Sequence, residues 1–145
     1  NRFTAGFIDY IIIYGFSYAY VYAFGEPNAD GGYTVNGIGG IIPVAFWCIM
    51  TIGFEQWIGA TIGNALVGLK PISIRGYVDI ENAIIQNEKI SFGQSLKRHL
   101  LDPLDMFFFG LIGIITIKNT DKNQRLGDIW ANTIVIETSE FKKEE

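Results

Sequence analysis

Long apolar stretches dominate the first half of the chain, and they predict two membrane-spanning helices. Residues 3–24 contain a single charged side chain, Asp9. About 20 apolar residues span a bilayer core as a helix, so this run is long enough to cross. A second uncharged run covers residues 38–54 and continues to Trp57, which predicts a second span over residues 38–57 with an aromatic anchor at its end.

A third apolar run, residues 104–117, is shorter. Asp102 and Pro103 precede it and have the pattern of a helix start, with Asp102 at the N-cap. A helix over the uncharged part, Met106 to Ile117, covers roughly 18 Å, well below the ~30 Å of a bilayer core. The run is re-entrant, or tilted, or a span completed by flanking residues. The predicted fold class is therefore mainly α: a membrane helical bundle with two full spans and a short third apolar helix.

Between the second and third apolar runs the pattern changes twice. Residues 69–80 (LKPISIRGYVDI) combine β-branched residues with a Pro and a Gly, which predicts a short extended segment and a turn. Residues 91–101 (SFGQSLKRHLL) have the pattern of an amphipathic helix. We expect residues 72–74 to pair as a strand with residues 134–136, on the cytoplasmic side of the membrane.

The basic residues predict the orientation. All 11 Lys and Arg residues lie outside the two predicted spans and outside the loop 25–37 that joins them. They occur at Arg2, after residue 69, and in the tail from Lys118. Because basic residues favour the cytoplasmic side, we expect an integral protein of the cell membrane with its N-terminus and tail in the cytoplasm. Three full spans would place the tail outside, and this conflict disappears if the third run enters and leaves on one side.

The composition narrows the class of protein further. The 145 residues predict one domain, residues 1–145, and 49% of them are hydrophobic. A net charge of -4 with dispersed basic residues gives no nucleic-acid footprint. Cys48 and His99 are the only Cys and His, so we expect no disulfide framework and no metal site. We also expect no cofactor; the expected partners are the lipid bilayer and a homo-oligomer or larger membrane complex.

Asp9 is the first candidate for chemistry, because an ionisable group at membrane depth costs several kcal/mol unless it is paired, neutralised or wetted. The nearest basic residue in sequence is Arg2, seven positions earlier, or roughly 10 Å along a helix axis. Asp9 is either a proton or ion site tuned by Arg2, or a buried carboxylate hydrogen-bonded to a neighbouring helix. Glu55 is a second candidate, interpreted as an interfacial carboxylate or a helix-end hydrogen bond.

Tyrosines recur every four residues in the first predicted span. They form one polar stripe along the helix: Tyr10, Tyr14, Tyr18 and Tyr22. Packing plus an interfacial belt explains them, since Tyr favours the headgroup level. Four phenols through the membrane depth exceed what a belt needs, so a hydrated groove or a helix contact is the alternative.

Two features between the apolar runs have a structural interpretation. Lys97, Arg98 and His99 lie together in the predicted amphipathic helix, where a basic cluster suits an anionic headgroup surface. His99 is interpreted as an interfacial residue without special chemistry. Gly59 and Gly63 form a small-xxx-small pair that permits close helix packing.

Four blocks of the chain resemble the RDD family of small membrane proteins, in order and spacing, over nearly the whole chain. They are RFTAGFID from residue 2, FEQWIGATIGNALVGLKPIS from residue 54, SFGQSLKRHLL from residue 91 and QRLGDIWANTIVI from residue 124. The family is named for an arginine at the head of the first helix and two aspartates, which correspond here to Arg2, Asp9 and Asp128. The family's middle segment contains Glu55, Gly59, Thr61 and Gly63. The chain departs from the pattern at Asn64, where members usually carry Lys, and at Asn132, where they often have Gly.

The resemblance implies a role in transport, with cation–proton exchange suggested for some members. We hypothesise an electrostatic cluster in which Arg2 reaches Asp128, Asp9 or both. Pairing with Asp128 leaves Asp9 free to bind a proton or a cation, whereas pairing with Asp9 makes the triad a structural clasp. The candidates for an ion or proton site are therefore Asp9, Arg2, Asp128 and Glu55. The alternative function is a small accessory or structural subunit of a larger membrane complex.

An enzyme is not expected, so no residue is given a catalytic role. An intramembrane aspartyl protease also needs two membrane acids, and residues 126–128 (LGD) are similar to a protease motif. However, Asp128 lies close to Arg125 in a charged tail, and the chain has too few spans to enclose a water-filled site.

Overall fold

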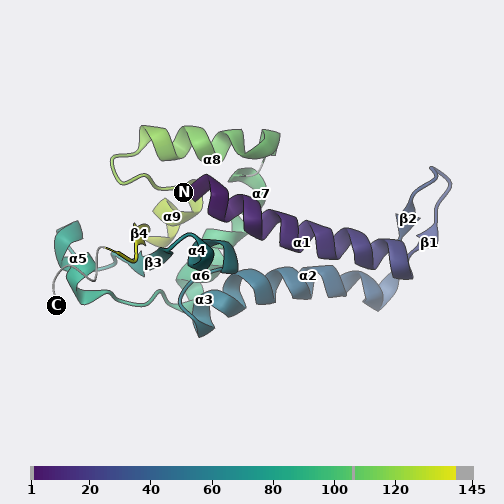
Figure 1. The fold of residues 1–145 in the computed structure, drawn as a ribbon, viewed down its shortest axis with the longest axis horizontal. Coiled ribbons are helices and arrows are strands. Elements are labelled where there is room, and N and C mark those ends of the chain that lie inside the picture. The colour runs from purple at the N-terminus through teal and green to yellow at the C-terminus, as the bar shows by residue number, and fades with distance from the viewer. Residues whose placement is uncertain (1, 106, 140–145) are drawn as a thin grey trace.

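The computed structural model describes residues 2–105 and 107–139, so Met106 and the end of the tail lie outside the described residues. Two long helical segments lie side by side along the longest axis of the molecule (Figure 1). At one end they are joined by an antiparallel hairpin of β1 (Glu26–Pro27) and β2 (Tyr33–Thr34). The remaining elements gather at the other end, around the start of the first helix.

The two long segments correspond to the two predicted spans. The first is α1 (Arg2–Phe24). The second is a continuous run of η1 (Gly37–Gly40), α2 (Ile41–Cys48), η2 (Ile49–Gly53) and α3 (Phe54–Trp57). Both are long and apolar enough to cross a membrane, with a mean hydropathy of 1.3 for the first and 1.9 for the second. Few of their side chains are buried within the chain, which suits helices whose surroundings are lipid.

The second segment accommodates two irregular features. Pro43 is tolerated because it is the third residue of α2, in the first turn, where backbone N–H groups have no intrahelical acceptor. Further along, η2 is a π-helical turn, in which the Thr51 hydroxyl donates to the Trp47 carbonyl at 2.7 Å. This turn leads directly into α3 and Glu55, and π-helical turns are frequent at functional sites.

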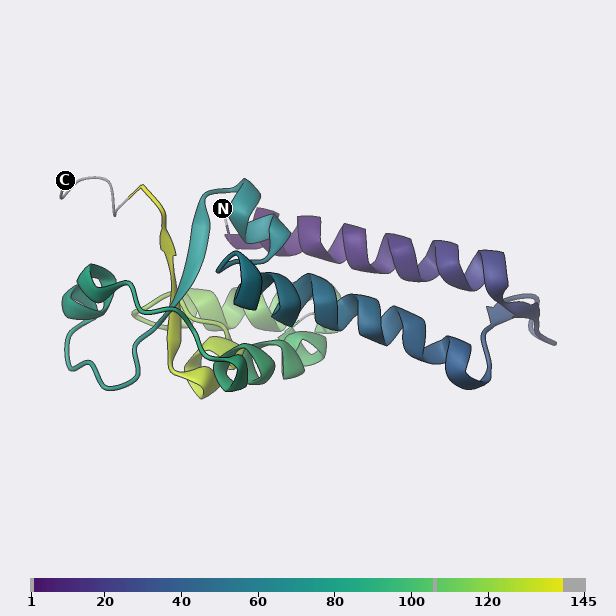
Figure 2. The ribbon, with the colours of Figure 1, turned by 90° about the horizontal axis from the view of Figure 1, so that it is seen from below.

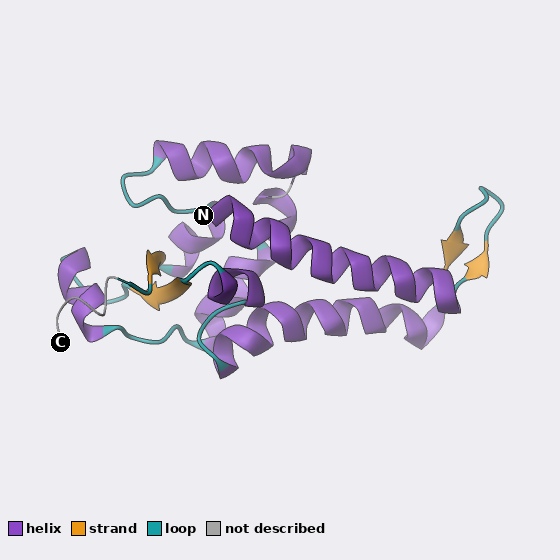
Figure 3. Ribbon diagram, in the orientation of Figure 1, coloured by secondary structure: helices purple, strands orange, loops and turns teal. Residues whose placement is uncertain are grey.

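The elements at the other end are short. In chain order they are α4 (Ile62–Leu66), β3 (Leu69–Ser73), α5 (Ile80–Gln86), α6 (Phe92–Leu100), α7 (Asp102–Asp105), α8 (Phe107–Asn119), α9 (Leu126–Ala131) and β4 (Thr133–Glu137). Figure 2 shows that α6 and α9 lie together beneath the end of the second segment, and Figure 3 shows the short β3–β4 ribbon at the same end of the molecule.

The strand pair confirms the predicted pairing of the two extended segments. β3 and β4 are antiparallel, with Ile72 opposite Ile134. Ile72 is fully buried and packs with Ile134 and Ala83 in a small apolar core. Asn132 adopts a left-handed conformation (φ 53°) between α9 and β4, a conformation that Asn and Gly tolerate best. The strand pair therefore holds α9 in place at its C-terminal end.

A buried glutamine ties α6 to these elements. The backbone N–H of Gln94 donates to the Ser91 hydroxyl at 3.3 Å, and the Ser91 N–H donates back to Gln94 Oε1 at 3.0 Å, which forms a capping box. Gln94 Nε2 also donates to Ser73 Oγ and to the Ala131 carbonyl, each at 3.0 Å. The predicted amphipathic helix is thus confirmed, and its first turn is fixed to both β3 and α9.

The third apolar run forms α8, a helix of 13 residues that is shorter than either long segment. Among the described residues, only the two long segments are long and apolar enough to span. α8 lies at the same end of the molecule as the start of α1 and β4 (Figures 1 and 2). Entry and exit of α8 on one side of the membrane remains a prediction, as does the cytoplasmic location of this end.

Candidate functional site

The first contact of the site joins the start of α1 to α9. Arg2 Nη2, at the start of α1, forms an ion pair with Asp128 Oδ2 in α9, and Arg2 Nη1 donates to the Asn123 carbonyl. Asp128 is 2% exposed, and its Oδ2 also accepts the backbone N–H of Arg125 at 3.0 Å. Of the predicted pairings of Arg2, the structure therefore has the one with Asp128.

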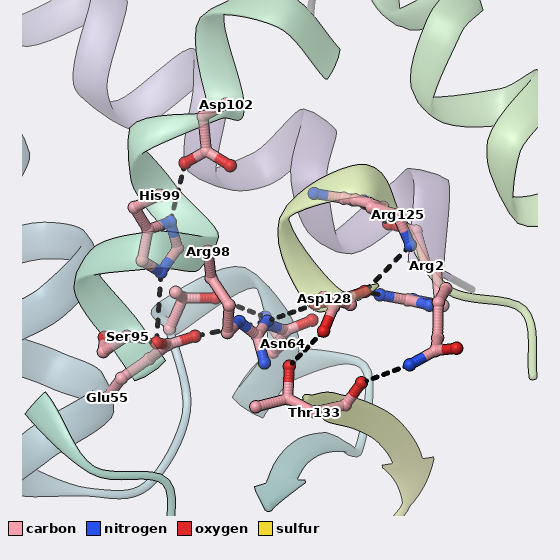
Figure 4. A network of polar contacts seen from close by, with 12 residues as sticks. Arg2, Glu55, Asn64, Ser95, Arg98, His99, Asp102, Arg125, Asp128 and Thr133 are labelled. Carbon is pink, nitrogen blue, oxygen red and sulfur yellow. Dashed lines mark hydrogen bonds and ion pairs between the residues drawn. The ribbon is translucent and has the colours of Figure 1, made fainter. Parts of the chain in front are cut away.

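A buried arginine extends this pair to the second span. Arg98 Nη2 lies 3.4 Å from Asp128 Oδ1 and 3.4 Å from Glu55 Oε1, so one guanidinium bridges two carboxylates (Figure 4). Burial alone would raise the pKa of Asp128, but the charges of Arg98 and Arg2 outweigh it and lower that pKa to about 2. Asp128 is therefore ionised at neutral pH despite its burial.

His99 continues the network on the other side of Glu55. His99 Nε2 lies 3.1 Å from Glu55 Oε2, and His99 Nδ1 lies 2.6 Å from Asp102 Oδ2 (Figure 4). Ser95 Oγ donates to Glu55 Oε2 at 2.5 Å. Burial would lower the pKa of His99, but Asp102 and Glu55 outweigh it and raise that pKa to about 10. His99 is thus a buried cation between two carboxylates.

This network changes the interpretation of four residues. His99 is 7% exposed and Glu55 is fully buried, so both side chains make specific polar contacts inside the protein, and His99 is not without special chemistry. Arg98, also 7% exposed, does not face headgroups. Asp102 lies within α7, and its carboxylate contacts His99. The physical reason is the spacing of the polar residues in α6: Gln94 and Ser95 are followed four residues later by Arg98 and His99. This spacing places all four on one face of the helix, and this face packs inward against α3 and α9.

We call the six residues of this connected group the charge network: Arg2, Glu55, Arg98, His99, Asp102 and Asp128. With His99 protonated, it contains three cations and three anions. They come from α1, α3, α6, α7 and α9, so the network links both long segments to the short helices. Its net charge is zero, which is what burial at such a position requires.

Asp9 lies outside the charge network and has neutral partners. Thr61 Oγ1 donates to Asp9 Oδ2 at 2.6 Å, and the Gly63 N–H donates to Asp9 Oδ1 at 2.7 Å. Among the described residues, no ion pair joins Asp9 to a basic side chain. The neighbouring-helix hydrogen bond predicted for Asp9 is therefore present, and the carboxylate has no cationic partner.

The two glycines predicted to pack helices closely have different roles. A Cβ on Gly63 would lie 2.0 Å from the Ala5 carbonyl, so α4 meets α1 at a distance that only glycine permits. Gly59 precedes α4 in a left-handed conformation (φ 86°) and is not on the same helix face. The close approach at Gly63 is what brings its N–H to Asp9.

A pocket of about 300 Å³ separates α1 and α2 from α6 and α9. Its polar wall includes Asp9, Thr61 and Arg98, and its apolar wall includes Ile13 and Trp47. At about 30 Å³ per molecule in the liquid, this volume corresponds to roughly ten waters. Asp9 therefore faces a space beside α1 that can hold water or an ion.

The tyrosine stripe divides along α1. Tyr10 and Tyr14 stack on each other, with ring centroids 4.1 Å apart, and line the pocket. Tyr18 is 78% exposed, and Tyr22 packs edge-on against Tyr33 near the hairpin. Only the first two tyrosines are thus close to Asp9.

Arg125 is a pocket residue that the sequence did not single out. Its Nη2 donates to the Arg2 carbonyl at 3.2 Å, and a Cβ on Gly6 would lie 2.8 Å from that nitrogen. Gly6 thus leaves the space that the guanidinium occupies. A glycine one turn before Asp9 is the only sequence signal for this contact. Within the described part of the chain, no cluster of His, Cys, Asp or Glu has the arrangement of a metal site.

Comparison with known proteins gives one match. The model of the RDD family matches residues 1–132, which covers every residue of the charge network, Asp9 and Arg125. No curated protein and no solved structure matches the chain.

Proposed function

We propose that this chain, which belongs to the RDD family of membrane proteins, takes part in transport by binding a proton or a cation at Asp9. One observation carries the proposal. Because Asp128 takes Arg2 as its partner, Asp9 has a carboxylate without a cationic partner among the described residues, and this carboxylate faces a pocket. An uncompensated charge at membrane depth is unfavourable, so a proton or a cation binding there is favoured.

The chemistry of the site suits exchange of a bound proton for a bound cation. Thr61 and Gly63 each donate one hydrogen bond to Asp9, which leaves acceptor positions on both oxygens. A single carboxylate holds either a proton or a cation, so the two compete for it. Competition at one site is the simplest basis for cation–proton coupling.

In this proposal the charge network is the frame of the site. Asp128 and Arg98 fix α9 and α6 against the two long segments, and the pocket lies between these elements. The net charge of the network is zero, so in this proposal the ion binds at Asp9 and not at the network. Arg2 and Asp128 therefore act on transport through the position of Asp9.

Flux in proteoliposomes tests the proposal. The unmodified protein is expected to exchange protons for a monovalent cation, and Asp9→Asn is expected to abolish the exchange. Asp30→Asn, in the exposed hairpin loop, is the matched control and is expected to keep full flux. Equal insertion of all three proteins must be established first. Flux that survives Asp9→Asn, or no flux from the unmodified protein, would overturn the proposal.

A small accessory subunit is the second candidate, and the exposed surface of the long segments favours it. Large apolar side chains remain open along both, such as Phe7 at 53%, Ile41 at 61% and Trp57 at 79%. Two spans are few for a machine that opens alternately to both sides, so a transporter of this kind needs further copies or a larger partner. Purification in a mild detergent, followed by flux measurements on the purified material, separates these cases: flux from the chain alone supports the transporter, and a fixed larger partner that carries flux without this chain supports the accessory role.

A further inference from the structure

α6 has its polarity reversed relative to a helix on a water-exposed surface. Its buried residues are polar: Gln94, Ser95, Arg98 and His99, between 0% and 7% exposed. Its apolar residues face outward, with Phe92 61%, Leu96 40% and Leu100 57% exposed. These three are spaced by four residues, so they form one continuous stripe. A helix at a water boundary shows the opposite arrangement, with the apolar stripe against the core.

α9 continues the same reversal. Gly127 and Asp128 are buried, and a Cβ on Gly127 would lie 2.3 Å from the Arg98 carbonyl, so the two helices pack very closely. The outward residues of α9 are Ile129 and Trp130, 43% and 47% exposed. The outer face of α6 and α9 is therefore one apolar surface, made of Phe92, Leu96, Leu100, Ile129 and Trp130.

We propose that this outer face binds the acyl chains and headgroups of the leaflet that holds the N-terminus of α1. The inference does not depend on transport. It assigns a lipid surface to two short helices outside both long segments.

Continuity with the second span is the first argument for lipid. Ser95 and His99 contact Glu55 in α3, so α6 lies directly against the end of that span. At the end of that span, Trp57 is 79% and Ile58 is 52% exposed. The backbone of α6 lies beneath the end of the second segment (Figure 2), so the exposed apolar residues of the span and of the α6 stripe belong to neighbouring elements. A membrane that surrounds the span meets α6 without a break.

Lys97 and Trp130 give the second argument. Lys97 is the exposed charged residue within α6, and its Nζ lies 5.6 Å from the centre of the Trp130 ring. A Trp beside a Lys is typical of the membrane–water boundary, because the indole ring favours the headgroup level and the ammonium group contacts lipid phosphates. Lys97 therefore marks the edge of the surface that meets anionic headgroups.

Fluorescence of Trp130 tests the proposal directly. The chain has three tryptophans, so Trp47→Phe together with Trp57→Phe leaves Trp130 as the single reporter. This variant is reconstituted in vesicles of phosphatidylcholine and phosphatidylglycerol, with or without lipid brominated near the carbonyl end of the acyl chains. Brominated lipid is expected to quench Trp130, and aqueous iodide is not. Quenching by iodide alone would place the surface in water. Quenching by neither would mean that protein, such as a second copy, covers it, and either result overturns the proposal.

A matched pair of substitutions checks the cause of the quenching. Leu100→Glu puts a charge in the stripe and is expected to reduce quenching by brominated lipid and shift the Trp130 emission to the red. Val78→Glu makes the same kind of change at a residue that is 97% exposed and outside the outer face, and no change is expected. Circular dichroism establishes that both variants keep their helices. Equal effects of the two substitutions would contradict a lipid contact at α6.

Discussion

Two sets of carboxylates lie at the same end of the molecule, and they are compensated in opposite ways. Asp128, Glu55 and Asp102 lie in the charge network, where each has at least one cation within 3.4 Å. Asp9 has only a hydroxyl and a backbone N–H. The charges of the first set are balanced by cations of the network. Asp9 is oriented but not neutralised, and this is what an ion site requires.

The pKa values of the charge network also bear on its role. With pKa values of about 2 for Asp128 and about 10 for His99, neither group exchanges a proton near neutral pH. The network therefore holds fixed charges under physiological conditions.

Removing the central cation of the network is expected to be the most damaging change. Arg98→Met leaves Glu55 and Asp128 buried with one cation fewer, and breaking a buried pair in this way costs about 3–5 kcal/mol. Urea unfolding in detergent micelles measures the loss. Arg75→Met, at an exposed position, is the control and should change stability little. Similar losses in the two variants would mean that Arg98 does not bridge the carboxylates.

The pH dependence of stability is expected to have a broad plateau. Protonated His99 contributes stability that is complete below pH 6.5 and is lost as the pH rises through about 10. Ionised Asp128 contributes stability that is complete above pH 3.8 and is lost as the pH falls through about 2. The midpoint temperature of thermal unfolding should therefore decrease at both the acidic and the alkaline end of this pH range. His99→Gln should remove the decrease at the alkaline end. A maximum at one pH, without a plateau, would contradict these fixed charges.

A double-mutant cycle tests the pair that joins the chain ends. Arg2→Gln and Asp128→Asn are expected to couple by roughly 0.5–3 kcal/mol, because residues in direct contact are not independent. The free energy of unfolding of the four proteins gives the coupling. Additive losses would mean that Arg2 and Asp128 do not stabilise each other directly.

The smallest effect is expected at the neutral partner of Asp9. Thr61→Val removes one hydrogen bond to Asp9 and the cap of α4, at a cost of about 1 kcal/mol. Cation-dependent flux should nevertheless weaken, because the carboxylate is less well oriented, whereas Thr61→Ser should keep both stability and flux. Unchanged flux in Thr61→Val would indicate that Asp9 does not need orientation by Thr61.

The elements predicted best from the sequence were those with a strong local pattern. Two apolar runs predicted the long segments, and β-branched residues predicted the β3–β4 pairing. The pairing of Arg2 with Asp128 was one of the open alternatives, since both residues were expected at one face of the membrane. Geometry at the start of α1 selects it, because Asp9 is turned toward α4 by Thr61 and Gly63.

The sequence could not predict which way α6 faces. Its polar and apolar stripes are visible in the pattern, but a pattern does not say which stripe packs against the protein. A helix on a water-exposed surface would direct Arg98 and His99 toward the solvent. In the structure they point inward, where they form ion pairs with Glu55, Asp102 and Asp128. Glu55 is 43 positions before Arg98, and no local rule joins residues so far apart. The pocket and the place of Arg125 over Gly6 depend on the same long-range packing.

The ion pair between Arg2 and Asp128 also sets an order of events during synthesis. The two residues are 126 positions apart, so a ribosome makes the arginine long before its partner. At about 5–20 residues per second, the delay is on the order of ten seconds. The pair therefore closes only after α9 has been made. A chain released before residue 128 lacks the anion that pairs with both Arg2 and Arg98.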